Sequence, residues 1–324
     1  MPLIRYEASD FGAHWGHQLS GTHDLQVTWQ ELVWAAITVG KPGLAHLLTH
    51  GWHSISDVIV RSHTIYAHLR QSSNRYEKSA LYQDLDPTEK GAASYFLGMV
   101  AAKVLCARLL DTPWLLHLSM FQATGGAVAL QGRSQPDLIG IDRNGRWIVA
   151  EAKGRSNDFS ADAMIKAKDQ TRRLRNINGA LPNVRVAVQA HFSPSLTFAI
   201  ADPDEIDPEA IDVSLDENAA IRQYYSFPVE ATQSNRRREE IGNRTFDFSD
   251  IEEVGVSIGL GTELLELLGE DEPVTFDALR GRIQGSTIKT TTEPVTFADG
   301  LIIKLDDRWS ETRMTYDPGK RKDG

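Results

Sequence analysis

The stretch SQPDLIGIDRNGRWIVAEAKGR, residues 134–155, contains two short apolar runs joined by an asparagine–glycine pair. Strand side chains alternate between the two faces of a sheet, so the second run places Glu151 and Lys153 side by side on one face. The first run opens with Pro136, whose missing N–H suits the first residue of a strand, and continues with Asp137. The pattern predicts a β-hairpin that carries two carboxylates and an ammonium group.

The length of the turn decides whether the two acids meet. A two-residue loop would leave Asp137 and Glu151 on opposite faces. A three-residue loop that ends at a left-handed Gly145 pairs Asp142 with Arg146 instead. In that register Asp137 lies opposite Glu151, with Cβ atoms about 5 Å apart, close enough for one divalent cation to bind both carboxylates. We predict the three-residue loop.

Two carboxylates beside a lysine suit phosphodiester hydrolysis. Mg²⁺ is commonly held by one or two carboxylates and keeps its other positions for water and phosphate oxygens, so Asp137 and Glu151 suffice as ligands. Two roles are open to Lys153: it stabilises the attacking hydroxide and the developing charge, or it accepts a proton. The alternative is an ordinary hairpin with surface charges. Burial of unpartnered acids among apolar neighbours is costly, which disfavours that alternative.

Pro136-Asp137, followed after the apolar hairpin by Glu151-Ala152-Lys153, resembles the PD-(D/E)XK phosphodiesterase superfamily, the restriction-endonuclease-like nucleases. The resemblance covers roughly the middle third of the chain. It implies an α/β fold with a restriction-endonuclease-like core, in which a mixed central sheet is flanked by helices. It also implies a Mg²⁺-dependent nuclease, with Mn²⁺ as a substitute, whose metal ligands are Asp137 and Glu151 and whose catalytic lysine is Lys153.

Two further residues are candidates for the same site. Asp86 begins a helix that should run to about Leu110, and Glu89 lies three residues after this cap. Some branches of the resembled superfamily place an acid of this helix in the metal site, so Glu89 is a candidate metal ligand; a capping-box glutamate is the alternative. Gln170 lies on the apolar face of a helix expected over 160–177, where several branches carry a glutamine. We expect it to position substrate or neighbouring catalytic groups, unless it lies at a solvated edge.

Composition and charge limit the class of protein. With 324 residues, 41% of them hydrophobic, the chain can build a sizeable core and about two domains. The net charge of −10 argues against general nucleic-acid binding by the whole molecule. Residues 143–175 nevertheless carry nine basic and four acidic side chains, a local patch of the kind that a phosphate backbone requires. Residues 201–220 carry eight acids and no base.

Cysteine usage and apolar segments indicate the compartment. The single cysteine, Cys106, excludes an internal disulfide and a cysteine-rich zinc cluster. The first residues contain no apolar run long enough for a signal peptide. The run over 95–110 is interrupted by Lys103 and Arg108 and is too short for a bilayer. We expect a cytoplasmic protein without a membrane partner.

The chain divides by pattern into four parts. Apolar residues at three- and four-residue spacing predict an N-terminal helical region over 1–84. A nuclease core over 85–201 follows, then a C-terminal α+β region over 202–312 that begins with an acidic linker, and a tail over 313–324. In the first part His46, His50 and His53 are spaced for one side of a helix and its end, but no other zinc ligand is evident, and partly buried or surface histidines are the alternative.

The leading function is a Mg²⁺-dependent deoxyribonuclease, expected to be an endonuclease, acting in restriction, defence against foreign DNA or repair. The first alternative is a non-catalytic nucleic-acid-binding or scaffold protein with a nuclease-like fold. The second is a helical interaction protein in which the hairpin is accidental. DNA is favoured over RNA as the partner, and a homodimer is left open.

Overall fold

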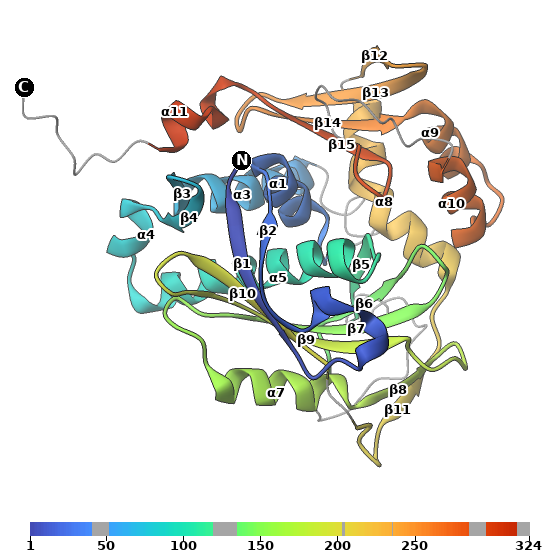
Figure 1. Ribbon diagram of the computed structural model, residues 1–324. Helices are drawn as coiled ribbons and strands as arrows, with labels where there is room; N and C mark the ends of the chain where they lie inside the picture. Colours follow the sequence, from blue (N-terminus) through green and yellow to red (C-terminus); the bar gives the residue numbers. More distant parts are fainter. Residues whose placement is uncertain (41–51, 119–134, 203–204, 235, 285–295, 316–324) are drawn as a thin grey trace, which may run out of the picture.

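The computed structural model describes residues 1–40, 52–118, 135–202, 205–234, 236–284 and 296–315. Within these ranges nine strands form one mixed sheet in the order β3-β4-β1-β10-β9-β7-β6-β5, and β2 pairs with β1 (Figure 1). Its strands are β1 (Leu3–Ser9), β2 (Gly21–Gln26), β3 (Leu69–Ser72), β4 (Arg75–Lys78), β5 (Trp114–His117), β6 (Leu138–Ile141), β7 (Trp147–Gly154), β9 (Val184–Phe192) and β10 (Leu196–Ala201).

Helices cover both faces of this sheet (Figure 1). On one side lie α1 (Trp29–Thr38), α3 (Trp52–His68) and α5 (Pro87–Leu109), with the short α4 (Ala80–Asp84) at the edge. On the other lies α7 (Ala161–Thr171), whose Met164 and Ala167 pack on Ala187, Ala199 and Ala201. All nine residues of β9 are buried, as expected for a strand covered on both faces. The expected α/β class, with a mixed central sheet flanked by helices, is confirmed.

The strands around the hairpin follow a simple order. β5, β6 and β7 form an antiparallel meander, and β9 then pairs parallel with β7, so that α7 lies in the connection between parallel neighbours. β10 returns antiparallel to β9. Both of these last strands coincide with apolar runs of the sequence, at 185–192 and 196–202.

The helix α5 is the central core helix. Asp86 caps it in a capping box with Glu89, and the helix ends one residue before the predicted Leu110. By length and composition α5 could cross a membrane, yet 67% of its apolar window is buried inside the molecule. Gly98 of α5 faces the β7 backbone, since a Cβ there would lie 2.7 Å from the Lys153 carbonyl carbon. Helix and strand therefore touch without an intervening side chain.

Residues 1–84 were predicted to form a helical region, but this region also contains strands. β1 lies inside the main sheet, parallel to β10 and antiparallel to β2, and two 3-10 turns (Ala13–Trp15 and His17–Leu19) connect β1 to β2. In β1, Ile4, Tyr6 and Ala8 are buried and alternate with exposed or half-exposed residues. This period-two pattern is the strand signal that the helical interpretation overlooked.

The helix expected over 160–177 is also shorter than predicted. It ends at Thr171, and Leu174–Ile177 form β8, which pairs parallel with β11 (Ile211–Val213) in a separate two-stranded sheet. Leu174 and Ile177 are both buried, and their spacing of three fits a helix as well as this short strand. Their strand partner comes from the segment read as an acidic linker, so the local pattern could not reveal it.

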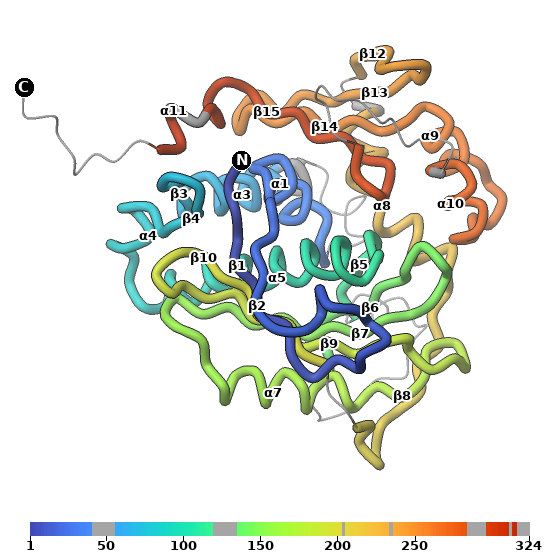
Figure 2. The backbone as a smooth tube through the Cα atoms, in the orientation of Figure 1, coloured from blue at the N-terminus to red at the C-terminus, as the bar shows by residue number. Residues whose placement is uncertain are grey.

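The C-terminal region is α+β, as expected. A four-stranded antiparallel sheet in the order β12-β13-β14-β15 packs with three helices. The elements are α8 (Glu217–Ser234), β12 (Arg237–Ile241), β13 (Arg244–Ile251), β14 (Val256–Gly261), α9 (Thr262–Gly269), α10 (Phe276–Gln284) and β15 (Leu301–Leu305). The chain then passes through a 3-10 turn (Asp307–Trp309) to α11 (Glu311–Met314), which lies beside β3 (Figure 2). Trp309 packs between Trp29 and Tyr66, with ring centroids 6.1 and 5.1 Å away.

Candidate functional site

The β6–β7 hairpin has the predicted three-residue loop. Leu138 pairs with Ala150, and the Asp142 N–H donates to the Arg146 carbonyl at 2.9 Å. Gly145 adopts a positive φ of 82°, as the bulged turn requires. The buried Asp142 carboxylate stabilises this turn by accepting the N–H groups of Asn144 and Arg146, each at 2.8 Å. The same register continued beyond Leu138 sets residue 137 opposite residue 151.

Asp137 and Glu151 are joined across the two strands. The Asp137 N–H donates to Glu151 Oε2 at 2.7 Å. Glu151 is fully buried, and burial together with the charge of Asp137 raises the pKa of its carboxyl to about 7. The ion pair with Lys153 acts in the opposite direction and lowers this pKa. The Asp137 and Glu151 carboxylates therefore lie close enough to repel each other, and an added cation would relieve this repulsion.

Lys153 connects this strand to the helix on the same face. Its ammonium group donates to Glu151 Oε1 and, at 2.7 Å, to the amide oxygen of Gln170. The Gln170 amide nitrogen donates in turn to the Gln135 carbonyl at 3.2 Å. Gln170, predicted from its polar character on an apolar stripe, thus contacts both the lysine and the segment that leads into Asp137. The structure brings these predicted residues together.

Glu89 lies elsewhere. Its carboxylate accepts the N–H of Asp86 at 3.2 Å, while the Asp86 carboxylate accepts the N–H of Glu89 at 3.1 Å. This is the capping box left open as the alternative. In α5, burial and the charges of Asp137 and Glu151 raise the pKa of Tyr95. Glu89 lies six residues before Tyr95, which is about 9 Å along the helix axis. The structure does not bring Glu89 to the other candidate residues.

Three side chains near the site were not predicted. Burial and, to a smaller extent, the charge of Asp137 raise the pKa of the half-exposed Tyr95. Burial lowers the pKa of His117, against the opposing influence of Asp137. Arg61 acts on both groups from α3 and is held by the carbonyls of residues 36 and 39, at 3.2 and 2.8 Å. Packing of the helices on the sheet brings these three side chains to the site, and no local sequence motif predicts that packing.

The residues fit a cation that needs few protein ligands. In the described part of the chain no group of three or more His, Cys, Asp or Glu side chains is placed to hold a metal. The described residues therefore contain no ligand cluster of the kind that holds zinc. A magnesium ion requires only one or two carboxylates, and Asp137 and Glu151 supply two. The full burial of the Glu151 carboxylate next to Asp137 favours such an ion, because a nearby positive charge would stabilise the ionised carboxylate.

The basic stretch beside the hairpin is largely paired with acids. At least six of its nine basic side chains form ion pairs: Arg143, Arg146, Lys153, Lys168, Arg172 and Arg175. The paired acids therefore offset much of the positive charge that residues 143–175 carry. Nucleic-acid binding by this face would have to compete with those acids.

Some predictions fall outside the described residues. They concern His46, His50, the side chain of His53 and the tail from residue 316.

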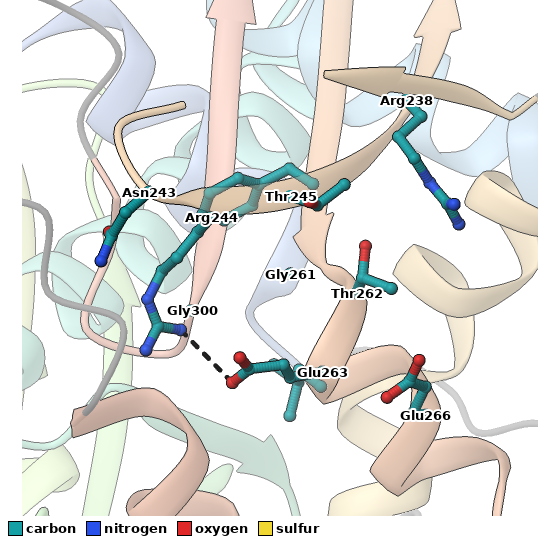
Figure 3. Close-up of a pocket in the computed structure, with 11 residues that line it drawn as sticks. Arg238, Asn243, Arg244, Thr245, Gly261, Thr262, Glu263, Glu266 and Gly300 are labelled. Atoms are coloured by element: carbon teal, nitrogen blue, oxygen red, sulfur yellow. Dashed lines mark ion pairs between the residues drawn. The ribbon is translucent and has the colours of Figure 1, made fainter. Parts of the chain in front are cut away.

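A separate cavity of about 250 Å³ lies in the C-terminal sheet, beside the start of α9 (Figure 3). Arg238 and Arg244 face Glu263 and Glu266 across it, and Arg244 pairs with Glu263 at 3.6 Å. Its arginine and glutamate charges balance, and none of the predicted catalytic residues lines it. We therefore place the candidate site at the hairpin.

No protein-family model matches the chain, and no curated protein or solved structure matches it either. The functional argument rests on the chain's own residues.

Proposed function

We propose that this chain is a divalent-metal-dependent nuclease that hydrolyses phosphodiester bonds of DNA. The register of the β6–β7 hairpin carries the proposal, because it sets Asp137 opposite Glu151. Lys153 follows two residues later on the same face. A buried carboxyl with a raised pKa, a second acid and a lysine in one place are typical of sites that perform chemistry.

The order of elements supports the same proposal. A core helix, three antiparallel strands, a second helix and a strand parallel to the third follow one another as α5, β5, β6, β7, α7 and β9. The PD-(D/E)XK resemblance implies this succession for a restriction-endonuclease-like core. We propose that finer fold assignment for residues 85–201.

Each residue has a role in the proposed site. Asp137 and Glu151 would hold Mg²⁺ or Mn²⁺, and the bound ion would supply Lewis-acid chemistry by acidifying water and neutralising phosphate charge. Lys153, held between Glu151 and Gln170, would donate a hydrogen bond to the attacking oxygen or to a phosphate oxygen. Gln170 would keep the lysine oriented during the reaction.

The test compares cleavage of circular and linear DNA and of RNA by the full chain, with Mg²⁺, with Mn²⁺ and with EDTA. We expect metal-dependent cleavage of DNA, with circular DNA cut as well as linear DNA. Asp137→Asn and Glu151→Gln should each lower the rate at least about 10²–10³-fold, as loss of one charge-stabilising group does. DNA binding should change little, because phosphate contacts are spread over many residues.

Glu89→Gln is the matched control for Glu151→Gln. Both replace a glutamate by its amide, and glutamine can still serve a capping box. The control should cleave at the parental rate. Metal-free binding without cleavage under any condition would favour the alternative of a non-catalytic nucleic-acid-binding protein, and loss of cleavage in Glu89→Gln would restore Glu89 to the metal site.

A further inference from the structure

Lys103, in the middle of α5, has no exposed surface. Its ammonium nitrogen donates to the Pro113 carbonyl and, at 2.6 Å, to the Tyr224 hydroxyl. The same nitrogen lies 4.5 Å from the ring centroid of Trp34 and 4.6 Å from that of Tyr224. No carboxylate of the described residues forms an ion pair with it. A lysine in this position is costly in its charged form.

The nearest acid is reached through the tyrosine. The Tyr224 hydroxyl donates to Asp299 Oδ2 at 2.5 Å, and the Trp34 indole donates to the same oxygen at 2.8 Å. The N–H of Leu301 donates to Asp299 Oδ1 at 3.1 Å. Asp299 is fully buried as well. Lysine, tyrosine and aspartate thus form one continuous hydrogen-bonded chain.

A second tyrosine reinforces the contact. The Tyr225 hydroxyl donates to the Asp299 carbonyl at 2.5 Å and accepts the Trp114 indole N–H at 2.8 Å. Phe297 lies two residues before Asp299, in the segment that leads into β15. Its ring stacks on that of Trp34, with centroids 4.6 Å apart and an interplanar angle of 8°. These contacts lie between the C-terminal region, which supplies α8 and the turn before β15, and the rest of the chain, which supplies α1, α5 and β5.

The charged neighbours of Lys103 can be named. Burial lowers the pKa of Lys103 to about 7, and the charge of Asp299 acts in the opposite direction. Burial raises the pKa of the Cys106 thiol to about 12, and it raises those of Tyr224 and Tyr225 well above their usual values, so all three are neutral near pH 7. The ammonium of Lys103 is therefore the group of this cluster that changes charge near neutral pH.

We propose that Lys103, Tyr224 and Asp299 form a proton-linked joint, which holds the C-terminal sheet to the rest of the chain more tightly when Lys103 is neutral. When the joint opens, the lysine reaches water and takes up a proton. Opening is consequently favoured by acid. This property does not depend on the proposed nuclease activity.

The sign of the pH effect follows from linkage. A lysine whose folded pKa lies below its unfolded value binds fewer protons when folded, so stability rises with pH through the window between the two values. Cys106 acts in the opposite direction above about pH 8.5, where an unfolded thiol ionises. Glu151, whose pKa is about 7, also acts in the opposite direction near pH 7, but equally in the parent and in lysine variants. The difference in slope between parent and Lys103 variant from about pH 7 to 8.5 therefore isolates Lys103.

The test measures the equilibrium constant of urea unfolding of the full chain between pH 7 and 8.5. We expect folding of the parent to become more favourable by up to tenfold per pH unit. Lys103→Met should flatten this dependence, and Lys90→Met, the same change near the start of α5, should keep the parental slope. Equal slopes in all three proteins would overturn the proposal.

A second measurement covers the case in which Lys103→Met does not fold. The parent, unfolded by urea in weakly buffered solution at pH 8, should take up a net of about half a proton per molecule or more, because Cys106 and Glu151 release part of the proton that Lys103 binds. Hydrogen exchange, corrected for its intrinsic pH dependence, should show β15 and α8 less protected at pH 6.5 than at pH 8 relative to β9. Absence of proton uptake, or parallel changes in β9 and β15, would contradict the joint.

Discussion

The amide oxygen of Gln170 lies 2.7 Å from the ammonium nitrogen of Lys153, so helix α7 and strand β7 meet in one hydrogen bond at the candidate site. Since Gln170 also donates to the Gln135 carbonyl, one side chain fixes the lysine and the entry to Asp137 together.

Gln170→Ala should therefore lower cleavage without removing a metal ligand. We expect a loss of about 10–100-fold in kcat, as is usual when a group that orients a ligand or catalytic side chain is lost, with little change in KM. Lys166→Ala, an exposed change one turn earlier on α7, is the control and should be silent. Steady-state kinetics on one DNA substrate measures both. Equal activity of Gln170→Ala and parent would remove Gln170 from the site.

Glu151→Gln should stabilise the metal-free protein above neutral pH. The carboxyl's pKa is raised from 4.5 to about 7, so the folded chain binds more protons than the unfolded chain in this window and the free energy of unfolding falls as pH rises through it. At pH 8 the variant should be more stable than the parent by roughly 1–3 kcal/mol. At pH 4.5 the two should nearly agree. Urea unfolding in EDTA at both pH values provides the comparison; a variant less stable at pH 8 would show that Glu151 is ionised at little cost.

Gly154→Ala should destabilise the fold strongly. A Cβ at Gly154 would overlap the Ser94 carbonyl group of α5, so helix and strand would have to separate, at a cost of about 3 kcal/mol or more. Gly91→Ala, in an exposed position of α5 with open space around the added carbon, should stabilise by about 0.5–1 kcal/mol. Denaturant unfolding of both variants tests the contact. A neutral Gly154→Ala would mean that α5 can shift freely.

The hairpin could be predicted because its determinants are local. A glycine at position 145 permits the positive φ, and Asp142 accepts the turn's N–H groups, so the register follows from residues within a few positions of the turn. The cap of α5 was equally local, with Asp86, Pro87 and Glu89 in adjacent positions. Gln170 could be found because a polar residue on an apolar stripe needs a partner.

The rest depended on contacts distant in sequence. Tyr95, His117 and Arg61 come from a helix, a strand and a second helix, and only packing gathers them around Asp137. Gly154, directly after Lys153, was the one available signal, because a glycine at a strand end often marks a close backbone approach. Similarly, β8 could not be distinguished from a helix end without its partner β11.

The pairing of β1 with β10 has a consequence for how the chain is made. Arg5 pairs with Thr197, so the first strand of the sheet cannot pair with β10 until almost two thirds of the polypeptide has left the ribosome. Until then β1 has only β2 and, at Leu3, β4 beside it, so the rest of the edge that later pairs with β10 stays open. Pairing of strands so far apart in the sequence is slow, and strand edges that are still unpaired are prone to aggregate. Newly synthesised chains should thus pass through a stage in which residues 3–9 are open to chaperones and proteases, and that stage ends only when β10 emerges.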